Sequence, residues 1–182
     1  LIDDHDRHLF AVKFVVQRRQ TFAVLFELLF VFFFRLVGVS GSSMYPTLVD
    51  HDYLVLESNF LYRDAKQGDI VVLYTPPFSE NDELLVKRVI GLPGETVQIS
   101  NGAVLINGEV YNENKNFPEI SNAGLASDGV SLESGEYFVL GDNRNNSEDS
   151  RYGDIGNINK KYIVGKVWFV ISPKDKFGFL KG

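Results

Sequence analysis

The sequence has 182 residues and no cysteine, which excludes disulfide bonds, thiol nucleophiles and thiolate metal sites. Histidine is scarce as well. Two of the three histidines, His5 and His8, precede any catalytic pattern, so a Ser-His-Asp triad would depend on His51 alone. A basic excess is also missing. The formal net charge of −6 argues against nucleic acid as a partner, because phosphate-binding surfaces need excess cations.

Several known catalytic patterns are absent too. The chain contains no Gly-x-Ser-x-Gly, no Ser-x-x-Lys, no phosphate-binding loop and no His-x-x-x-His pair. Residues 141–154 are similar to a calcium loop, but Arg144 stands at a ligand position and Ser147 where glycine is required. We therefore expect neither a metal ion nor another cofactor.

Residues 21–38 form an aromatic and aliphatic segment that Glu27 and Arg35 interrupt. Extended through Val39, it would measure about 28 Å as a helix, close to the thickness of the hydrocarbon core of a bilayer. We expect a single-pass membrane anchor over residues 21–38. A buried helix or strand packed on the domain is the alternative.

The residues before this segment favour an inside N-terminus, because they carry three cations. We expect a cytoplasmic tail over residues 1–20 and an extracytoplasmic domain over residues 39–182. A cleaved secretory signal peptide fits less well, because no small-residue cleavage site follows the apolar run. The cations are Lys13, Arg18 and Arg19.

The remainder of the chain has a pattern typical of β-structure, so the expected fold class is mainly β with an antiparallel sheet. Asn101-Gly102 lies between two apolar runs and predicts a hairpin, and Asn107-Gly108 predicts a second tight turn. We expect these hairpins and a polar surface excursion at about 96–136. Strands are predicted over residues 53–57, 70–74, 84–92, 137–140 and 162–171.

Lys87 lies inside an apolar strand, where a cation is unusual. Strand alternation places it on the face of Leu85 and Val89, opposite Val86, Arg88 and Ile90. Burial of that face would disfavour the ammonium and lower the lysine pKa, which suits a general base. The alternative is an exposed lysine that protects an edge strand from aggregation.

Three segments in this order resemble the motifs of the type I signal peptidases, especially their short Gram-positive form. Residues 40–47 read Ser-Gly-Ser-Ser-Met-Tyr-Pro-Thr and are similar to the nucleophile motif. Residues 87–95 read Lys-Arg-Val-Ile-Gly-Leu-Pro-Gly-Glu and are similar to the motif of the base. Residues 141–151 read Gly-Asp-Asn-Arg-Asn-Asn-Ser-Glu-Asp-Ser-Arg and are similar to the third motif. The resemblance covers residues 39–172 and implies the antiparallel β-sheet fold of that family.

The resemblance implies a serine endopeptidase in which Ser43 is the nucleophile and Lys87 the general base. Ser147 would orient Lys87, and the backbone N–H of Ser43 would hold the oxyanion. Some members of the family add a serine hydroxyl two residues before the nucleophile, where this chain has Gly41. Ser42 or a water molecule could take that place, and the sequence leaves the two open.

The resemblance also implies supporting residues around the site. Structural ion pairs beneath it would involve Arg88, Asp142, Asp149 and Arg151. The substrate groove would be lined by Met44, Leu48, Leu85 and Val86.

By this resemblance, the substrates would be secretory preproteins, cleaved after small residues of the Ala-x-Ala type. Membrane lipid is the other expected partner, and a monomer is expected. A self-cleaving repressor would need a DNA-binding motif, for which residues 1–38 are too apolar and too few. An inactive homologue acting as a membrane scaffold is disfavoured because Ser43 and Lys87 are both present.

Overall fold

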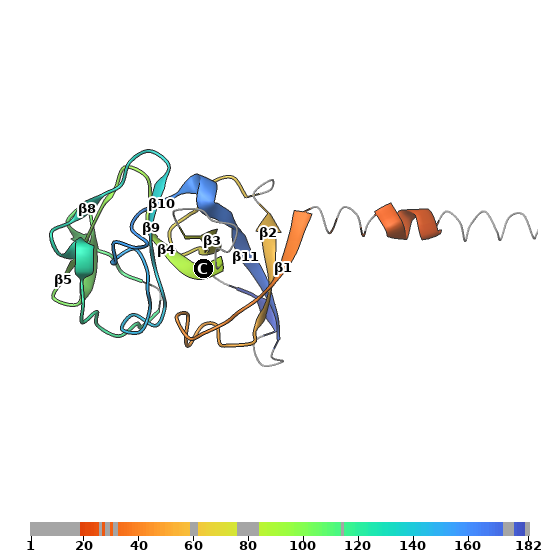
Figure 1. Cartoon of the computed structure of the whole chain (residues 1–182), viewed down its shortest axis with the longest axis horizontal. Coiled ribbons are helices and arrows are strands. Elements are labelled where there is room, and N and C mark those ends of the chain that lie inside the picture. Colours follow the sequence, from red (N-terminus) through yellow and green to blue (C-terminus); the bar gives the residue numbers. More distant parts are fainter. Residues whose placement is uncertain are drawn as a thin grey trace, which may run out of the picture.

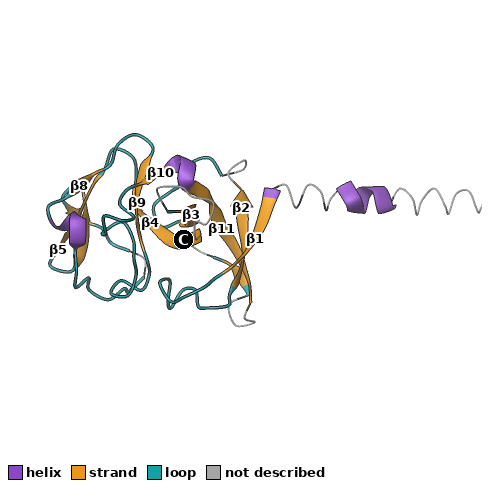
Figure 2. Ribbon diagram, in the orientation of Figure 1, coloured by secondary structure: helices purple, strands orange, loops and turns teal. Residues whose placement is uncertain are grey.

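A computed structural model of the chain describes residues 19–25, 27, 30, 33–58, 62–75, 84–113, 115–172 and 177–180. Strands make up most of the regular structure (Figure 2). Two short 3-10 helices, η1 (Gly124–Ser127) and η2 (Lys160–Tyr162), join them in the described part. The strands are β1 (Phe34–Gly38), β2 (Tyr53–Ser58), β3 (Ile70–Tyr74), β4 (Leu84–Gly91), β5 (Thr96–Ser100), β6 (Ala103–Ile106), β7 (Glu109–Val110), β8 (Val130–Ser131), β9 (Glu136–Leu140), β10 (Ile158–Asn159), β11 (Ile163–Ser172) and β12 (Gly178–Phe179).

The strands form two antiparallel sheets, as the pattern of the sequence predicted. The larger sheet has the order β1-β2-β11-β3-β4-β9-β10, with β12 paired to β11. The smaller sheet has the order β7-β6-β5-β8. In Figure 1, β5 and β8 lie at one end of the two sheets, and β1, β2 and β11 lie at the other. The expected mainly β architecture is confirmed.

Strand β4 lies inside the larger sheet, with β3 on one side and β9 on the other. Its side chains alternate as expected, since Leu85 and Val89 pack in one hydrophobic cluster and Val86 in another. Lys87 pairs with Val71 of β3 and is only 2% exposed. The edge-strand alternative for Lys87 is therefore excluded.

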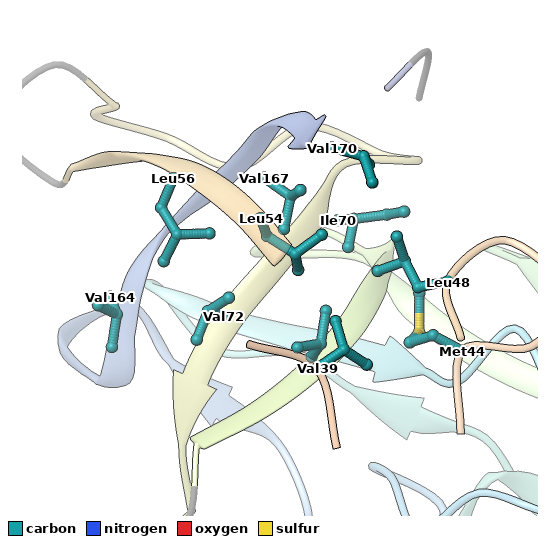
Figure 3. Close-up of a cluster of buried hydrophobic side chains, with 11 residues drawn as sticks. Val39, Met44, Leu48, Leu54, Leu56, Ile70, Val72, Val164, Val167 and Val170 are labelled. Atoms are coloured by element: carbon teal, nitrogen blue, oxygen red, sulfur yellow. The ribbon is translucent and has the colours of Figure 1, made fainter. Parts of the chain in front are cut away.

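A hydrophobic cluster on the Val86 side of the sheet anchors the loop between β1 and β2 (Figure 3). Met44 and Leu48 of that loop are buried, and Leu48 N–H donates to the Met44 carbonyl at 2.9 Å. This turn directs both side chains into the sheet. Their neighbours there include Leu54, Leu56, Ile70, Val72, Val164, Val167 and Val170.

The smaller sheet packs against the β4–β9 side of the larger one. Val97 of β5, Phe138 of β9 and Ile90 of β4 share one buried cluster. Gly91 ends β4 at this contact, and a Cβ there would lie 2.3 Å from Val97 Cγ2 and 2.7 Å from Leu132 Cδ1. Only glycine allows this approach without a shift of the packed side chains.

The two asparagine-glycine turns take the predicted form. Asn101 and Gly102 have φ angles of 50° and 77°, and Asn107 and Gly108 have 53° and 84°. Two successive positive φ angles define a type I′ turn, whose twist matches that of a hairpin. The predicted hairpins are confirmed.

The segment after these hairpins is more than the polar surface excursion that its composition predicted. It contains η1 and β8, and its isolated apolar residues Ile120, Ala126 and Leu132 are buried in the cluster beneath the smaller sheet. These apolar side chains are too widely spaced to show a helix or strand period, so the sequence did not indicate that they are buried. Each of them covers part of the smaller sheet.

The N-terminal apolar segment divides. Residues 19–25 are helical, together with the described residues 27, 30 and 33. The expected anchor over residues 21–38 is corrected at its end, because Phe34–Gly38 forms strand β1 and pairs with β2. Val37 is half-buried against the core cluster, which explains why this end joins the sheet.

The rest of the N-terminal prediction is untested. Among the described residues, no helix is both long and apolar enough to cross a bilayer. Most of the predicted tail over residues 1–20 and part of the predicted anchor lie outside the described residues.

Candidate active site

The loop between β1 and β2 presents Ser43 next to β4 of the larger sheet. Two hydrogen bonds close the base of the loop: Val39 N–H donates to the Asp52 carbonyl at 2.8 Å, and His51 N–H donates to the Val39 carbonyl at 3.0 Å. Met44 is buried in the core, so its neighbour Ser43 is held in place while remaining partly exposed.

Lys87 reaches this serine from the middle of β4. Its Nζ lies 2.9 Å from Ser43 Oγ, which is hydrogen-bonding distance. Burial lowers the pKa of Lys87 from 10.5 to about 8, against the opposing charges of Asp149 and Glu148. A short contact to a serine and an ammonium that is easily deprotonated are what a general base needs.

The loop of residues 141–151, here the third-motif loop, is bonded directly to the Ser43 loop. Asn143 N–H donates to the Ser43 carbonyl at 3.0 Å, and Asn143 Nδ2 donates to the Ser42 carbonyl at 3.1 Å. Asn146 Nδ2 donates to Ser42 Oγ at 3.2 Å. The two loops come from distant parts of the chain, so these bonds fix their mutual position.

Gly141 packs closely against the Ser43 loop. A Cβ at this position would lie 2.1 Å from Ser147 Oγ and 2.5 Å from the Ser43 carbonyl oxygen. The first glycine of the third motif is therefore required by packing rather than by φ. A larger residue here would push the Ser43 loop away from the third-motif loop.

The predicted ion pairs are present beneath the site. Arg88 Nε and Nη2 each donate to one Asp142 carboxylate oxygen at 2.7 Å. Arg151 Nε donates to Asp149 Oδ1 at 2.8 Å, and Asp149 Oδ2 also accepts from Gly141 N–H at 3.0 Å. All four charged side chains are buried, so they hold the third-motif loop rather than exchange protons with substrate.

A third ion pair was missed from the sequence. Arg144 donates through both Nη atoms to the carboxylate of Glu113, lies 4.1 Å from the centre of the Phe117 ring, and donates from Nε to the Gly141 carbonyl at 3.1 Å. Glu113 and Phe117 belong to the polar segment after the hairpins. The only signal in the sequence was the negative charge of Glu113 in that segment. A single acidic residue does not show that Arg144 is its partner.

Ser43 and Lys87 open into one cavity of about 540 Å³. Its walls come from the Ser43 loop, from β4 and from the third-motif loop with the residues that follow it. The lining residues are Ser40–Ser43, Leu85, Lys87, Asn145–Glu148, Tyr152, Asp154 and Ile155.

The predicted groove residues are therefore only partly brought to this cavity. Leu85 lines it, whereas Met44, Leu48 and Val86 are buried in the core and do not. Val86 points away from Lys87 because strand neighbours face opposite sides, and Met44 and Leu48 anchor the loop. That these three line the substrate groove stays a prediction.

Ser147 lies in the cavity with Lys87, as its expected orienting role requires. Its hydroxyl donates to the Glu148 carbonyl at 3.4 Å. Ser147 and Lys87 are both described, and no hydrogen bond joins Ser147 Oγ to Lys87 Nζ, which instead contacts Ser43 Oγ. The orienting role stays a prediction.

Comparison with known proteins places these motifs in a family. The sequence model of the family described as "Signal peptidase, peptidase S26" matches residues 13–172. Signal peptidase I P of Bacillus subtilis subsp. natto is 39% identical over 166 residues, covering 87% of this chain and 88% of that protein. Signal peptidase I T of Bacillus subtilis strain 168 is 42% identical over 161 residues, covering 83% and 81%.

Among solved structures, a signal peptidase I from Enterococcus faecalis V583 aligns with a TM-score of 0.47 and 29% identity, covering 58% of this chain and 97% of that one. The family match and the relatives, rather than this alignment, decide the assignment. Together they show that the chain belongs to the signal peptidase family, peptidase S26.

Proposed function

We propose that this peptidase removes N-terminal signal peptides from secretory preproteins, cleaving after small residues of the Ala-x-Ala type. Ser43 would be the nucleophile and Lys87 the general base. The observation that carries the proposal is the 2.9 Å contact between Lys87 Nζ and Ser43 Oγ inside an open cavity. An inactive scaffold would have no need to bury a lysine against a serine.

The lowered pKa supports Lys87 as the base. With a pKa of about 8, about a tenth of the Lys87 side chains are neutral at pH 7, compared with about one in 2,500 for an ordinary lysine. Burial supplies this change without a second catalytic side chain. A neutral lysine can accept a proton from a serine hydroxyl, which an ammonium cannot.

The reaction follows from these two groups. Neutral Lys87 takes the proton of Ser43 as Ser43 Oγ attacks the scissile carbonyl carbon, and the carbonyl electrons move onto its oxygen. The ammonium then gives that proton to the leaving amine. Water, activated by the same lysine, hydrolyses the resulting acyl-enzyme and releases Ser43.

Ser147 is proposed to limit the positions that Lys87 can adopt, since both line the same cavity. Ser147→Ala is then expected to lower kcat several-fold while the chain still folds, and steady-state kinetics measure it. Removal of the hydroxyl leaves space beside Lys87, so the lysine side chain can adopt conformations that no longer contact Ser43. An unchanged kcat would contradict this role.

We also propose that the domain works at a membrane surface, attached through the N-terminal apolar segment with its N-terminus inside. Support comes from an aromatic face, defined as Phe34, Trp168, Phe169, Phe177 and Phe179. The rings contact one another at centroid distances of 4.9–5.2 Å, yet Phe177 and Phe179 are each 65% exposed.

A bulge in β11 contributes to this face. The register with β2 shifts between Val167 and Phe169, so Trp168 has no partner there and points outwards, 38% exposed. Tryptophan and phenylalanine at an exposed surface favour the interface between water and lipid. Phe34 begins the strand that follows the apolar segment, so the aromatic face and the proposed anchor would meet the same bilayer.

The direct experiment is cleavage of a synthetic preprotein peptide with an Ala-x-Ala site by the full chain in detergent. Wild type is expected to cut after the second alanine, and Ser43→Ala and Lys87→Ala are expected to be inactive but folded. Ser131→Ala serves as the control, because Ser131 lies on β8 away from the cavity. Activity in either catalytic variant would contradict the mechanism, and a folded wild type that leaves the peptide intact would contradict the function.

A further inference from the structure

The proposed reaction places a negative charge on the carbonyl oxygen, and one donor alone stabilises it poorly. The backbone N–H of Ser43 is the first donor. Position 41 offers no second one: a Cβ at Gly41 would have no atom within 4 Å, and the Gly41 N–H already donates to Asp50 Oδ1 at 3.0 Å. Another group in the cavity must complete the oxyanion hole.

Most polar groups of the third-motif loop are already engaged. Asn145 accepts from the backbone N–H of Ser121 and donates to the Glu119 carbonyl. Ser147 donates to the Glu148 carbonyl. Asn143 Nδ2 donates to the Ser42 carbonyl. These groups hold the walls of the cavity and would have to break a bond to reach a substrate.

Ser42 differs from them. Its Oγ accepts from Asn146 Nδ2 at 3.2 Å, and no acceptor for its own hydrogen is present among the described residues. The side chain is exposed, lines the cavity and belongs to the residue directly before the nucleophile. A hydroxyl that accepts one hydrogen bond and makes none with its own hydrogen can donate to a substrate. The bond that it accepts also polarises the hydroxyl and strengthens the bond that it donates.

We propose that the Ser42 hydroxyl, held in place by the Asn146 amide, donates the second hydrogen bond to the oxyanion, an assignment that rests on the proposed Ser43–Lys87 mechanism. As the bond from Ser43 Oγ to the carbonyl carbon forms, the proton passes to Lys87 Nζ. The carbonyl π electrons become a lone pair on oxygen, which accepts from Ser43 N–H and from Ser42 O–H. Ser42 keeps its proton throughout. Ser42 is a catalytic residue in this scheme, and Asn146 positions it.

Steady-state cleavage of the Ala-x-Ala peptide separates this role from a structural one. Ser42→Ala is expected to lower kcat about 100-fold, the usual effect of removing one oxyanion donor, with KM changed less than about twofold. Ser42→Thr keeps a hydroxyl and is expected to restore most of the rate. Ser131→Ala is the matched control, because Ser131 Oγ also makes a side-chain pair of 3.2 Å, with Thr96, but on the smaller sheet.

Asn146→Ala is expected to lower kcat about tenfold, since it removes one neutral hydrogen bond that fixes the hydroxyl. The double variant Ser42→Ala/Asn146→Ala is expected to be no slower than Ser42→Ala, because the two residues act as one unit. Additive losses would contradict the positioning role of Asn146.

A second measurement does not need turnover. A peptide aldehyde forms a tetrahedral adduct with Ser43, whereas the corresponding peptide alcohol does not. Ser42→Ala is expected to weaken aldehyde binding by the same factor as kcat/KM and to leave alcohol binding unchanged. Equal losses for both ligands, or kcat within about twofold of wild type, would overturn the assignment. Failure of wild type itself to cleave would instead contradict the proposed function, while the aldehyde-to-alcohol ratio would still report on Ser42.

Discussion

At the scale of single residues, Lys87 shows how the site opposes the stability of the fold. Its side chain is 2% exposed inside the larger sheet, where burial disfavours the ammonium. The same burial makes the amine available at neutral pH. The structure therefore accepts a less stable charge in its interior at the position where a proton acceptor is proposed to act.

The first prediction concerns pH. Because neutral Lys87 is the proposed base, kcat/KM should rise with pH through about 8, the pKa of Lys87, and level off above it. Glu148 raises that pKa, so Glu148→Gln should move the midpoint to lower pH and increase kcat/KM at pH 7. Rate profiles of the peptide reaction measure both effects. Glu109→Gln on exposed β7 is the control, and an acid optimum would point to a different base.

The second prediction concerns stability. The pKa of Lys87 is lower in the folded chain than its ordinary 10.5, so the penalty is complete below about pH 8 and disappears as pH rises past 10.5. That difference corresponds to about 3 kcal/mol. Lys87→Met keeps the volume but loses the hydrogen bond to Ser43, worth about 1 kcal/mol.

Urea unfolding at pH 7 should therefore show Lys87→Met to be more stable than wild type by about 2 kcal/mol, although inactive. At pH 10.5 the penalty is nearly gone, so the lost hydrogen bond should leave Lys87→Met slightly less stable than wild type. A variant less stable than wild type at pH 7 would mean that the lysine is not penalised in the folded chain.

At the scale of structural elements, the site consists of two loops supported by strand β4. The Ser43 loop is anchored through Met44 and Leu48, and the third-motif loop is held by buried ion pairs. The segment after the hairpins adds a support of its own through Glu113, Phe117 and Arg144. The geometry of the proposed catalytic site is thus supported by a part of the chain that carries no motif.

The third prediction tests that support. Glu113→Gln leaves the guanidinium of Arg144 buried without its counter-charge, which should cost about 3 kcal/mol of unfolding free energy. Asp64→Asn is the matched control, since Asp64 pairs with Lys160 on the surface, where the loss should be below about 1 kcal/mol. Urea denaturation of both variants measures the difference. Equal losses would show that Arg144 is effectively solvated.

At the scale of the whole molecule, function is expected to depend on how the domain meets the lipid surface. The aromatic face lies on β1, β11 and β12 and the residue before β12, whereas the smaller sheet lies at the other end of the two sheets (Figure 1). This arrangement would turn one end of the molecule towards the bilayer and keep the other in water.

The fourth prediction uses the single tryptophan of the chain, Trp168, as a reporter. In the full chain reconstituted into phospholipid vesicles, brominated lipids should quench Trp168 fluorescence, because its ring would lie at the bilayer interface. Trp168→Phe/Val110→Trp moves the reporter to exposed β7 of the smaller sheet, where no quenching is expected. Quenching at both positions or at neither would contradict the proposed orientation.

Features that depend on local chemistry could be predicted from the amino-acid sequence alone. The strand at residues 70–74 follows from its run of Val, Ile and Leu, and the alternation around Lys87 follows from the period of two in a strand. The two asparagine-glycine turns follow from the φ angles that a turn requires. The resemblance also implied that Arg88, Asp142, Asp149 and Arg151 form ion pairs, and such pairs are present, although which acid each arginine meets was not predicted.

Which side chains contact one another could be seen only in the folded chain. Met44, Leu48 and Val86 pack in the core, Phe34–Gly38 forms a strand, and Glu113 makes an ion pair with Arg144. Each outcome depends on contacts between segments far apart in the chain, whose free energy comes from burial and desolvation rather than from local pattern. For the same reason, the strand pattern marks Lys87 as a candidate and the resemblance marks Ser43, but only the packed sheet brings their side chains to 2.9 Å.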